Sequence, residues 1–269
     1  MARASSRRTK GNGRAGRKSR GVRWLRVLLV GIGCAAAVAI AFVLSLPSAE
    51  PLRDQWPATT ALIEARAAQA KAKGLAARRV QRLVPLSRIS PWLQRAVVDS
   101  EDARFWEHDG LDRVETETAL RKAVERGKLG RGASTLTQQL AKNLWLGEER
   151  SLLRKAKELV LARRLEALGK DRVLELYLNI VEWGSGIYGA EAAARTWFKK
   201  PAAQLSPEES AVLAAMLPAP RRRNPRRPSG KLLSRSAEIL ELYSLYGQLR
   251  GAELDAARQR LKRLLPSPP

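Results

Sequence analysis

Cysteine and histidine are almost absent from this chain, which has one of each among its 269 residues. A single cysteine, Cys34, excludes a disulfide scaffold, a CxxC redox motif and a thiolate zinc site. A single histidine, His108, excludes a metal site built from several imidazoles, and any Ser-His-Asp mechanism would depend on that residue. Hydrophobic residues make up 45% of the chain and charged residues 28%, so the sequence predicts a folded protein rather than a disordered one.

Acidic residues are scarce relative to basic ones. The chain has 50 Lys and Arg against 26 Asp and Glu, which gives a formal net charge of +24. Such an excess indicates an anionic partner, which can be a phosphate group, a nucleic acid or a membrane surface. Residues 1–26 contain no acid and ten basic residues, namely Arg3, Arg7, Arg8, Lys10, Arg14, Arg17, Lys18, Arg20, Arg23 and Arg26.

An uncharged segment over residues 27–46 follows this basic tail, and only two glycines and Ser45 interrupt its apolar residues. A helix of that length spans the roughly 30 Å hydrocarbon core of a bilayer. Basic residues on its N-terminal side keep that end in the cytoplasm. We therefore predict an uncleaved transmembrane signal anchor, with the rest of the chain outside the cytoplasm. A cleavable signal peptide is the alternative, because the small residues Ser48 and Ala49 follow, but the apolar segment is longer than the usual core of about 7–15 residues.

The exported part keeps a net charge of +14, which is the total of +24 less the ten charges of the N-terminal tail. Beyond a membrane, lipid phosphates are a more plausible anion than nucleic acid, so we expect no nucleic-acid partner. The alternative is a solvated basic face near anionic headgroups. Part of the charge forms a basic cluster of Arg221, Arg222, Arg223, Arg226, Arg227 and Lys231.

After residue 46 the sequence predicts an almost wholly helical chain, because Ala, Leu, Arg, Glu and Lys dominate and no clear run alternates with a period of two. Capping residues followed by proline mark helix starts at Ser90 and at Ser206, where Ser-Pro-Glu-Glu forms a capping box. We expect a connector over 47–83, a main helical domain over 84–228 and a C-terminal helical tail over 229–269. The expected helices cover residues 60–72, 90–103, 112–126, 134–143, 151–168, 171–181, 190–198 and 206–217.

Glu101 is the first candidate for chemistry. It lies near the C-terminal end of the helix predicted from Ser90, where the helix dipole disfavours a carboxylate and raises its pKa toward that of a general base. Asp102 beside it, with Phe105 and His108 after it, can supply an orienting neighbour and an apolar wall. The alternative is that Glu101 and Asp102 are surface acids paired with nearby arginines.

Polar side chains gather at the start of the helix expected from residue 134. Hydroxyl and amide groups at Ser134, Thr135, Thr137, Gln138 and Gln139 follow a glycine, in a pattern typical of a loop that turns into a helix. Backbone N–H groups at such a start, together with short hydroxyls, favour phosphate or sugar hydroxyls as ligands. The alternative is a helix start with more capping residues than it needs.

The helix predicted from Ser151 carries cations on the same face as an acid. Arg154 and Lys155 lie one turn before Glu158, which is typical of the salt bridges on a surface helix. The functional alternative is a carboxylate held by cations beside a pyrophosphate, with Lys142 and Arg150 completing a positive pocket.

Taken in order, these segments resemble glycosyltransferase family 51. The resemblance rests on Glu-Asp-Ala-Arg-Phe-Trp-Glu-His-Asp-Gly at 101–110, Gly-Ala-Ser-Thr-Leu-Thr-Gln-Gln at 132–139 and Arg-Lys-Ala-Lys-Glu at 154–158. It continues through Tyr-Leu-Asn at 177–179 with its glycine loop and through residues 205–220. Val-Glu-Trp-Gly at 181–184 is similar to the form found in the monofunctional peptidoglycan transglycosylases. The resemblance covers about 84–228, and two departures from the family pattern, Leu111 and Arg223, lie outside the expected chemistry.

The resemblance implies a lysozyme-like helical lobe with a smaller jaw lobe, held by one N-terminal transmembrane helix in a bacterial inner membrane, with the catalytic domain on the periplasmic side. It implies polymerisation of lipid II into glycan strands, with inversion and release of undecaprenyl pyrophosphate. Glu101 is then the general base that takes the proton of the acceptor 4-hydroxyl. Glu158 is the second acidic position, which assists the charge arrangement or a divalent ion. The sequence itself requires no cofactor, and Mg²⁺ or Mn²⁺ stays open as a divalent cation.

Substrate contacts are implied in the same way. Lys142, Arg150 and Lys157 match the positions that hold the departing diphosphate. The expected partners are lipid II, the growing glycan strand, membrane phospholipids and other cell-wall synthases. The other positions expected to bind substrate are Asp102, Phe105, His108, Ser134, Thr135, Thr137, Gln138, Gln139, Asn143, Arg154, Lys155 and Asn179.

Two other functions stay open at this point. A muramidase or lytic transglycosylase also uses one glutamate in a helical lobe, and a catalytically idle membrane-tethered scaffold is the other alternative. The cationic row of Lys142, Arg150 and Lys157 favours the synthetic enzyme, because an enzyme that releases a neutral leaving group has no use for a pyrophosphate pocket. We expect no transpeptidase domain, since residues 229–269 are too few to form one and the chain contains no Ser-x-x-Lys.

Overall fold

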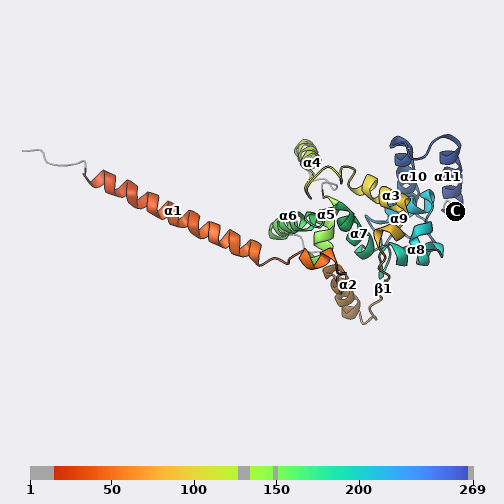
Figure 1. Cartoon of the computed structure of the whole chain (residues 1–269), viewed down its shortest axis with the longest axis horizontal. Helices are drawn as coiled ribbons and strands as arrows, with labels where there is room; N and C mark the ends of the chain where they lie inside the picture. Colours follow the sequence, from red (N-terminus) through yellow and green to blue (C-terminus); the bar gives the residue numbers. More distant parts are fainter. Residues whose placement is uncertain (1–14, 127–133, 148–150, 266–269) are drawn as a thin grey trace, which may run out of the picture. The chain divides into compact units, whose positions relative to one another are not determined.

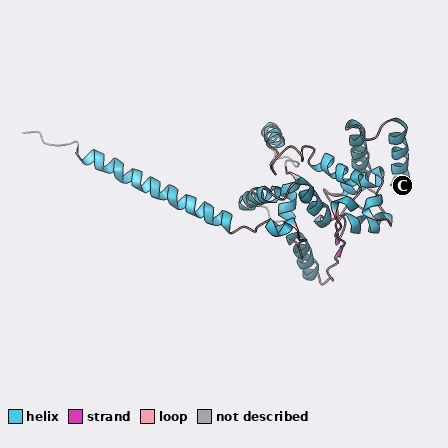
Figure 2. Ribbon diagram, in the orientation of Figure 1, coloured by secondary structure: helices cyan, strands magenta, loops and turns pink. Residues whose placement is uncertain are grey.

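The computed structural model describes residues 15–126, 134–147 and 151–265. These residues are mainly helical, as Figure 2 shows, which confirms the predicted fold class. The chain divides into two compact units, Met1–Leu46 and Pro47–Pro269.

The first unit contains helix α1 (Ala15–Leu44). Its segment Trp24–Leu44 has a mean hydropathy of 2.8 and is long and apolar enough to cross a membrane. At about 1.5 Å per residue these 21 residues span about 32 Å, close to the thickness of a hydrocarbon core. The helix ends two residues before the predicted boundary, because Pro47 disfavours helical geometry at the preceding residue.

The second unit contains ten α-helices in the described ranges, and Figure 1 shows most of them. A parallel pair of two-residue strands, β1 (Val80–Gln81) and β2 (Ile187–Tyr188), ties the segment after α2 to the glycine loop. The helices are α2 (Ala61–Ala72), α3 (Pro91–Glu101), α4 (Arg113–Arg126), α5 (Leu136–Ala141), α6 (Leu152–Glu166), α7 (Lys170–Ile180), α8 (Ala190–Phe198), α9 (Pro207–Met216), α10 (Gly230–Leu245) and α11 (Gly251–Leu264).

Helix starts follow the capping residues in the sequence. The Ser206 capping box is present at α9, and Ser151 accepts a hydrogen bond from the Arg154 amide at the start of α6. Ser90 stands at the N-cap of α3, but its hydroxyl does not cap the helix and donates instead to the Leu205 carbonyl at 2.8 Å. This bond ties the start of α3 to the turn before α9.

The end of α3 and the start of α5 differ from the predicted bounds. Helix α3 stops at Glu101 rather than at residue 103, because the backbone of Asp102 leaves helical geometry, with φ of −160° and ψ of 68°. Helix α5 starts at Leu136 behind the N-cap Thr135, and a π-helical turn over Lys142–Leu146 follows it. The first difference places Glu101 at the last residue of its helix.

The core of the second unit surrounds α9, from Glu208 to Met216 buried at every position. Helix α9 packs against α3, α10 and α11, and α5 packs against α6 and α7. The C-terminal helices contribute to this core through the buried side chains of Ile239, Leu240 and Tyr243. They are therefore part of the packed unit that carries the candidate site.

Candidate functional site

Glu101 lies at the C-terminal residue of α3 and is held by a hydrogen-bonded chain. Its Oε2 accepts a bond from Gln139 Nε2 at 3.2 Å, and Gln139 Oε1 accepts one from the Tyr177 hydroxyl at 3.0 Å. Because a phenol donates to the amide oxygen, the amide nitrogen of Gln139 must face Glu101. Three helices, α3, α5 and α7, thus fix the orientation of one carboxylate.

The pKa of Glu101 is raised above its ordinary value. Burial is the main cause, since it disfavours the charged form. The hydrogen bond from Gln139 opposes this rise, as do the positive charges of Arg235, Arg223 and Lys142 in that order. A carboxylate with a raised pKa holds a proton more strongly than an ordinary glutamate does, which suits a general base.

Asp102 and His108 form part of the interior next to Glu101. Asp102 Oδ2 accepts the Leu136 amide at 2.8 Å, and Oδ1 lies 2.9 Å from His108 Nε2. The Gly110 amide donates to His108 Nδ1 at 3.1 Å, so Nδ1 carries no proton and Nε2 is the donor to Asp102. Asp102 thereby joins the end of α3 to the start of α5, which fixes where Glu101 meets Gln139.

Phe105 is fully buried, with the Lys170 ammonium 4.4 Å from the centre of its ring. We expected Asp102, Phe105 and His108 to contact substrate. Phe105 lies in the packed interior, and Asp102 and His108 are 8% and 9% exposed. The polar atoms of Asp102 and His108 bond within the protein, which supports a role in shaping the site, and Asp102 also borders a hollow together with Glu101. Contact of these three residues with substrate stays a prediction.

The predicted polar turn separates into two groups. Thr135 caps α5 by accepting the Gln138 amide, and its hydroxyl donates to the Gly110 carbonyl at 2.8 Å. Thr137 is fully buried and donates to Glu166 on α6, away from Glu101. Ser134 and Thr135 line a hollow of about 250 Å³ that Glu101 also borders. Only part of the turn therefore faces the candidate base.

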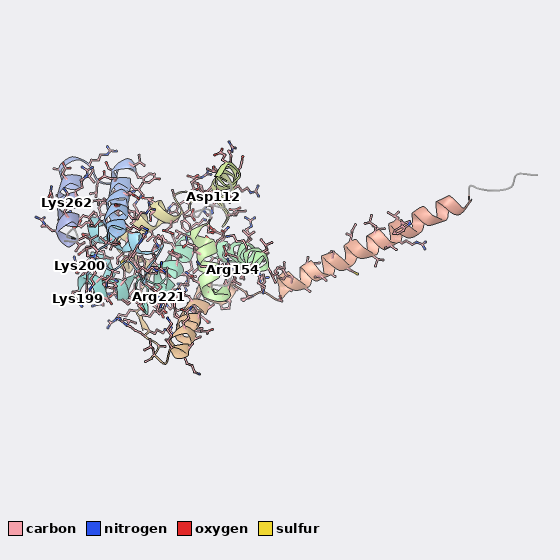
Figure 3. All side chains as sticks on the ribbon, turned by 180° about the vertical axis from the view of Figure 1, so that it is seen from behind. Asp112, Arg154, Lys199, Lys200, Arg221 and Lys262 are labelled. Atoms are coloured by element: carbon pink, nitrogen blue, oxygen red, sulfur yellow. The ribbon has the colours of Figure 1, made fainter. Side chains whose placement is uncertain are left out.

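Glu158 on α6 is 3% exposed and carries two cations. Its Oε2 accepts from Arg154 at 2.6 Å and its Oε1 from Lys155 at 2.5 Å. The Lys155 ammonium also donates to Ser134 Oγ at 3.2 Å and to Gln138 Oε1 at 3.0 Å. Figure 3 labels Arg154 on this helix. The Glu158 cluster, made of these five residues, connects α6 to the polar turn.

A divalent cation does not fit this arrangement. Both carboxylate oxygens of Glu158 already accept hydrogen bonds from cations, and a metal ion would have to displace Arg154 and Lys155. Within the described residues, no group of three or more His, Cys, Asp or Glu side chains comes together as metal ligands. The residues of the cluster are thus arranged for ion pairing rather than for metal coordination.

Gln139 also lines a second, larger cleft of about 550 Å³. Lys142 and Asn143 from the π-helical turn line it, together with Tyr177. The segment from Leu217 to Arg222, which follows α9, lines it as well, and Figure 3 labels Arg221 there. Gln139 therefore connects this cleft, which it lines, to Glu101, which borders the smaller hollow.

Two predicted cations cannot be assigned to the cleft in the same way. Lys157 lies on α6 and is partly exposed, and it does not line the cleft with Lys142. Arg150 lies outside the residues that the structure describes. Of the expected row, the structure therefore describes Lys142 and Lys157, and Lys142 lines the cleft.

Asn179, which we expected to contact substrate, is fully buried. Its Oδ1 accepts the Val84 amide at 2.9 Å, and its Nδ2 donates to the carbonyls of Val84 and Glu175. Close to it, Gly189 has a φ of +83°, and a Cβ there would lie 2.6 Å from the Asn179 carbonyl oxygen. Asn179 thus fastens the chain near residue 84 to α7, and Gly189 allows the backbone to pass close to Asn179.

Sequence reasoning missed several residues near the candidate base. Tyr177 belongs to a segment that we singled out, but its link to Gln139 has no counterpart in the residue spacing. Arg223 from the basic cluster and Arg235 from α10 both act on the charge of Glu101. Arg66 from α2 lines the cleft and pairs with Glu182 at 2.9 Å. Each depends on long-range packing, which no local pattern encodes.

Comparison with known proteins agrees with this geometry. A family model described as Transglycosylase matches residues 68–244, which is more than half of the chain. A biosynthetic peptidoglycan transglycosylase of Thiobacillus denitrificans is 48% identical over 203 residues, which cover 74% of this chain and 85% of the relative. The protein of the same name from Bordetella pertussis is 44% identical over 233 residues, which cover 82% and 94% respectively.

A third relative with that name, from Rhodospirillum centenum, is 52% identical over 160 residues, which cover 59% of this chain and 69% of the relative. The family match begins in α2 and ends within α10, so it contains Glu101, Gln139, the Glu158 cluster and all of the cleft lining except Leu62 and Arg66. The match and these relatives show that the chain belongs to the transglycosylase family.

Proposed function

We propose that this protein is a peptidoglycan glycosyltransferase that polymerises lipid II into glycan strands and releases undecaprenyl pyrophosphate. The observation that carries the proposal is that Glu101 borders a hollow of about 250 Å³ while its hydrogen-bond partner Gln139 lines a cleft of about 550 Å³. A polymerase must hold two glycan-bearing substrates on either side of one base. Relatives that carry the name biosynthetic peptidoglycan transglycosylase support the same reaction class.

In this proposal Glu101 is the general base. Its ionised Oε2 takes the proton from the 4-hydroxyl of the acceptor sugar while that oxygen attacks the anomeric carbon of the donor. The new C–O bond forms as the bond to the diphosphate breaks on the opposite side, which inverts the configuration. The hydrogen bond from Gln139 keeps the carboxylate oriented during this transfer.

The departing diphosphate needs positive charge near the bond that breaks. Lys142 lines the larger cleft and supports this role, and we assign Arg150 and Lys157 to the same task by family resemblance. Arg154 and Lys155 are already paired with Glu158, so we assign Lys155 to holding Ser134 and Gln138 in place and Arg154 to holding Glu158. Glu158 then acts as a positioning residue.

We also propose that Trp24–Leu44 is a single-pass anchor in the bacterial inner membrane, with the N-terminus in the cytoplasm and the second unit in the periplasm. Its length and apolar composition support the span, and the ten basic residues before it support the orientation. The positive charge of the exported part would then meet phospholipid headgroups. Contact with other cell-wall synthases is a further part of this proposal.

The deciding experiment is lipid II polymerisation by the purified full-length protein in detergent, beside its Glu101→Gln variant. The variant is nearly isosteric, so we expect it to fold and to lose polymerisation by at least about 10²-fold, as for loss of a general base. Polymer from the variant at the rate of the wild type would refute the base assignment. Shortened strands from preformed glycan, without new polymer, would favour a lytic enzyme, and neither product would favour a scaffold.

A further inference from the structure

Helix α10 lies antiparallel to α3 and is bonded to it at both ends. Near the start of α10, the Arg235 guanidinium donates to the Ser100 carbonyl at 3.0 Å. Near its end, the Tyr243 hydroxyl donates to the Trp92 carbonyl at 2.7 Å, and the two aromatic rings meet edge to face at 5.2 Å. The two bonded residues on α10 are eight positions apart, and so are their two partners on α3, which is about 12 Å along each helix. The two bonds therefore hold equal lengths of α3 and α10 side by side.

The packing between these bonds is continuous. The buried residues of α10, from Leu232 and Ser236 to Ile239, Leu240 and Tyr243, recur with the spacing of one helix face. Helix α10 packs against both α3 and α9 along this face. A shift of α3 along its own axis would thus break contacts in α10 as well, and Glu101 is the last residue of α3.

Arg235 meets α3 where a cation has most effect. The last carbonyl groups of a helix lack partners within the helix and carry partial negative charge. The Ser100 carbonyl is one of these, and its partner Arg235 belongs to the charges that act on the neighbouring Glu101 carboxylate. The side chain of Arg235 is 34% exposed and also pairs with Glu238 at 3.0 Å, so its position is held from two sides.

Charged and polar groups approach Glu101 from every element packed around it. Lys142 comes from the π-helical turn and Arg223 from the segment after α9, in addition to Arg235 from α10. Gln139 supplies the direct hydrogen bond, and Tyr177 on α7 lies behind Gln139. Arg235 is also bonded to the backbone of the helix that carries Glu101.

We propose that Arg235 is a positioning residue for the reaction, which holds the end of α3 so that the Glu101 carboxylate faces the acceptor hydroxyl. This inference rests on the proposed function, in which Glu101 is the base. It gives the C-terminal helix α10 a part in catalysis without any contact between Arg235 and the substrate. A purely structural role for Arg235 would change stability but would leave the pH dependence of the reaction unaltered.

The experiment compares three full-length variants with the wild type. Arg235→Gln removes the positive charge, and Arg235→Lys keeps it. Arg258→Gln is the matched control, because Arg258 on α11 is also partly exposed and paired with acids, Glu241 and Asp255, away from Glu101. For each protein, the rate of lipid II polymerisation is measured against pH and the melting temperature is recorded.

The expected direction follows from the charge. Loss of the cation makes proton release from Glu101 harder, so its pKa rises further, and the acidic limb of the rate profile moves to higher pH. We expect Arg235→Gln to polymerise about two- to fivefold more slowly at neutral pH, as for loss of a cation at a helix C-terminus. Arg235→Lys should restore the acidic limb of the wild-type rate profile, and the rate profile of Arg258→Gln should overlay that of the wild type.

Two results would overturn the proposal. One is a profile of Arg235→Gln that overlays that of Arg258→Gln. The other is a loss of rate that Arg235→Lys does not restore and that follows the melting temperature, which would leave a structural role only. A wild type that makes no polymer would instead refute the proposed function.

In that case the Glu101 carboxyl is titrated by NMR in protein carrying ¹³C-labelled glutamate, with Glu101→Gln to assign its signal. A midpoint that Arg235→Gln leaves unchanged would then overturn the positioning role.

Discussion

Replacing Glu158 with glutamine tests whether this residue holds the site together. The substitution keeps the shape of the side chain and removes its negative charge. Arg154 and Lys155, which bond to the two carboxylate oxygens at 2.6 and 2.5 Å, then face a neutral amide. One of the amide positions is a nitrogen, which donates hydrogen bonds and cannot accept one from a cation.

The magnitude follows from burial. Breaking a buried ion pair by removing one partner costs about 3–5 kcal/mol, because the remaining charge stays without compensation. The Glu158 side chain is 4% exposed and that of Arg154 is 19% exposed, but that of Lys155 is 41% exposed and can regain water. We therefore expect a cost just below that range, about 2–3 kcal/mol. For a domain of 150–250 residues this corresponds to a fall of roughly 4–12 °C in melting temperature.

The assay is thermal unfolding followed by circular dichroism, with Glu241→Gln as the control. Glu241 pairs with Arg258 at the surface, where its side chain is 47% exposed, so its loss should cost at most about 1 kcal/mol. A Glu158→Gln variant that melts with this control would refute the reasoning. If it melts like the wild type but loses polymerisation, Glu158 acts in the chemistry and not through the cluster.

Two other substitutions test the framework around the base. Tyr177→Phe removes the donor that orients Gln139, so we expect a loss of about 1 kcal/mol in unfolding free energy and about a tenfold lower polymerisation rate; a rate equal to that of the wild type would show that the amide of Gln139 is oriented without the phenol. Gly189→Ala forces a side chain into a backbone with φ of +83° and within 2.6 Å of a carbonyl oxygen. The strain alone costs about 1–3 kcal/mol, and an unchanged melting temperature would contradict it.

The sequence alone was sufficient to predict most helices and the family. Helix starts depend on local hydrogen bonds between a side chain and its own next turn, so Ser151 and Ser206 mark them reliably. The apolar segment before residue 47 is equally local, since only its length and composition matter to a bilayer. Glu101 could be chosen as the base because its place near a helix end and its neighbours in the motif are both visible in the sequence.

The sequence did not predict which side chains of the motifs face the candidate site. The family motif groups Asp102, Phe105 and His108 with Glu101, but α3 ends at Glu101 and the other three side chains are buried, with only Asp102 among them bordering the hollow beside Glu101. Thr137 was predicted to bind substrate because its neighbours in the motif are polar, whereas in the structure its hydroxyl donates to Glu166. Residues next to each other in a motif need not face the same space, because consecutive residues of a helix lie about 100° apart.

What the sequence by itself determined is therefore the class of the fold, the apolar anchor helix and the identity of the candidate base. Only the tertiary structure decided what surrounds that base. Tyr177 and Arg235 reach the site from helices that lie far from Glu101 in the chain, and each acts at one end of a hydrogen bond or charge interaction. Local propensity fixes a helix, but a pKa and a side-chain orientation depend on burial and on charges brought close by packing.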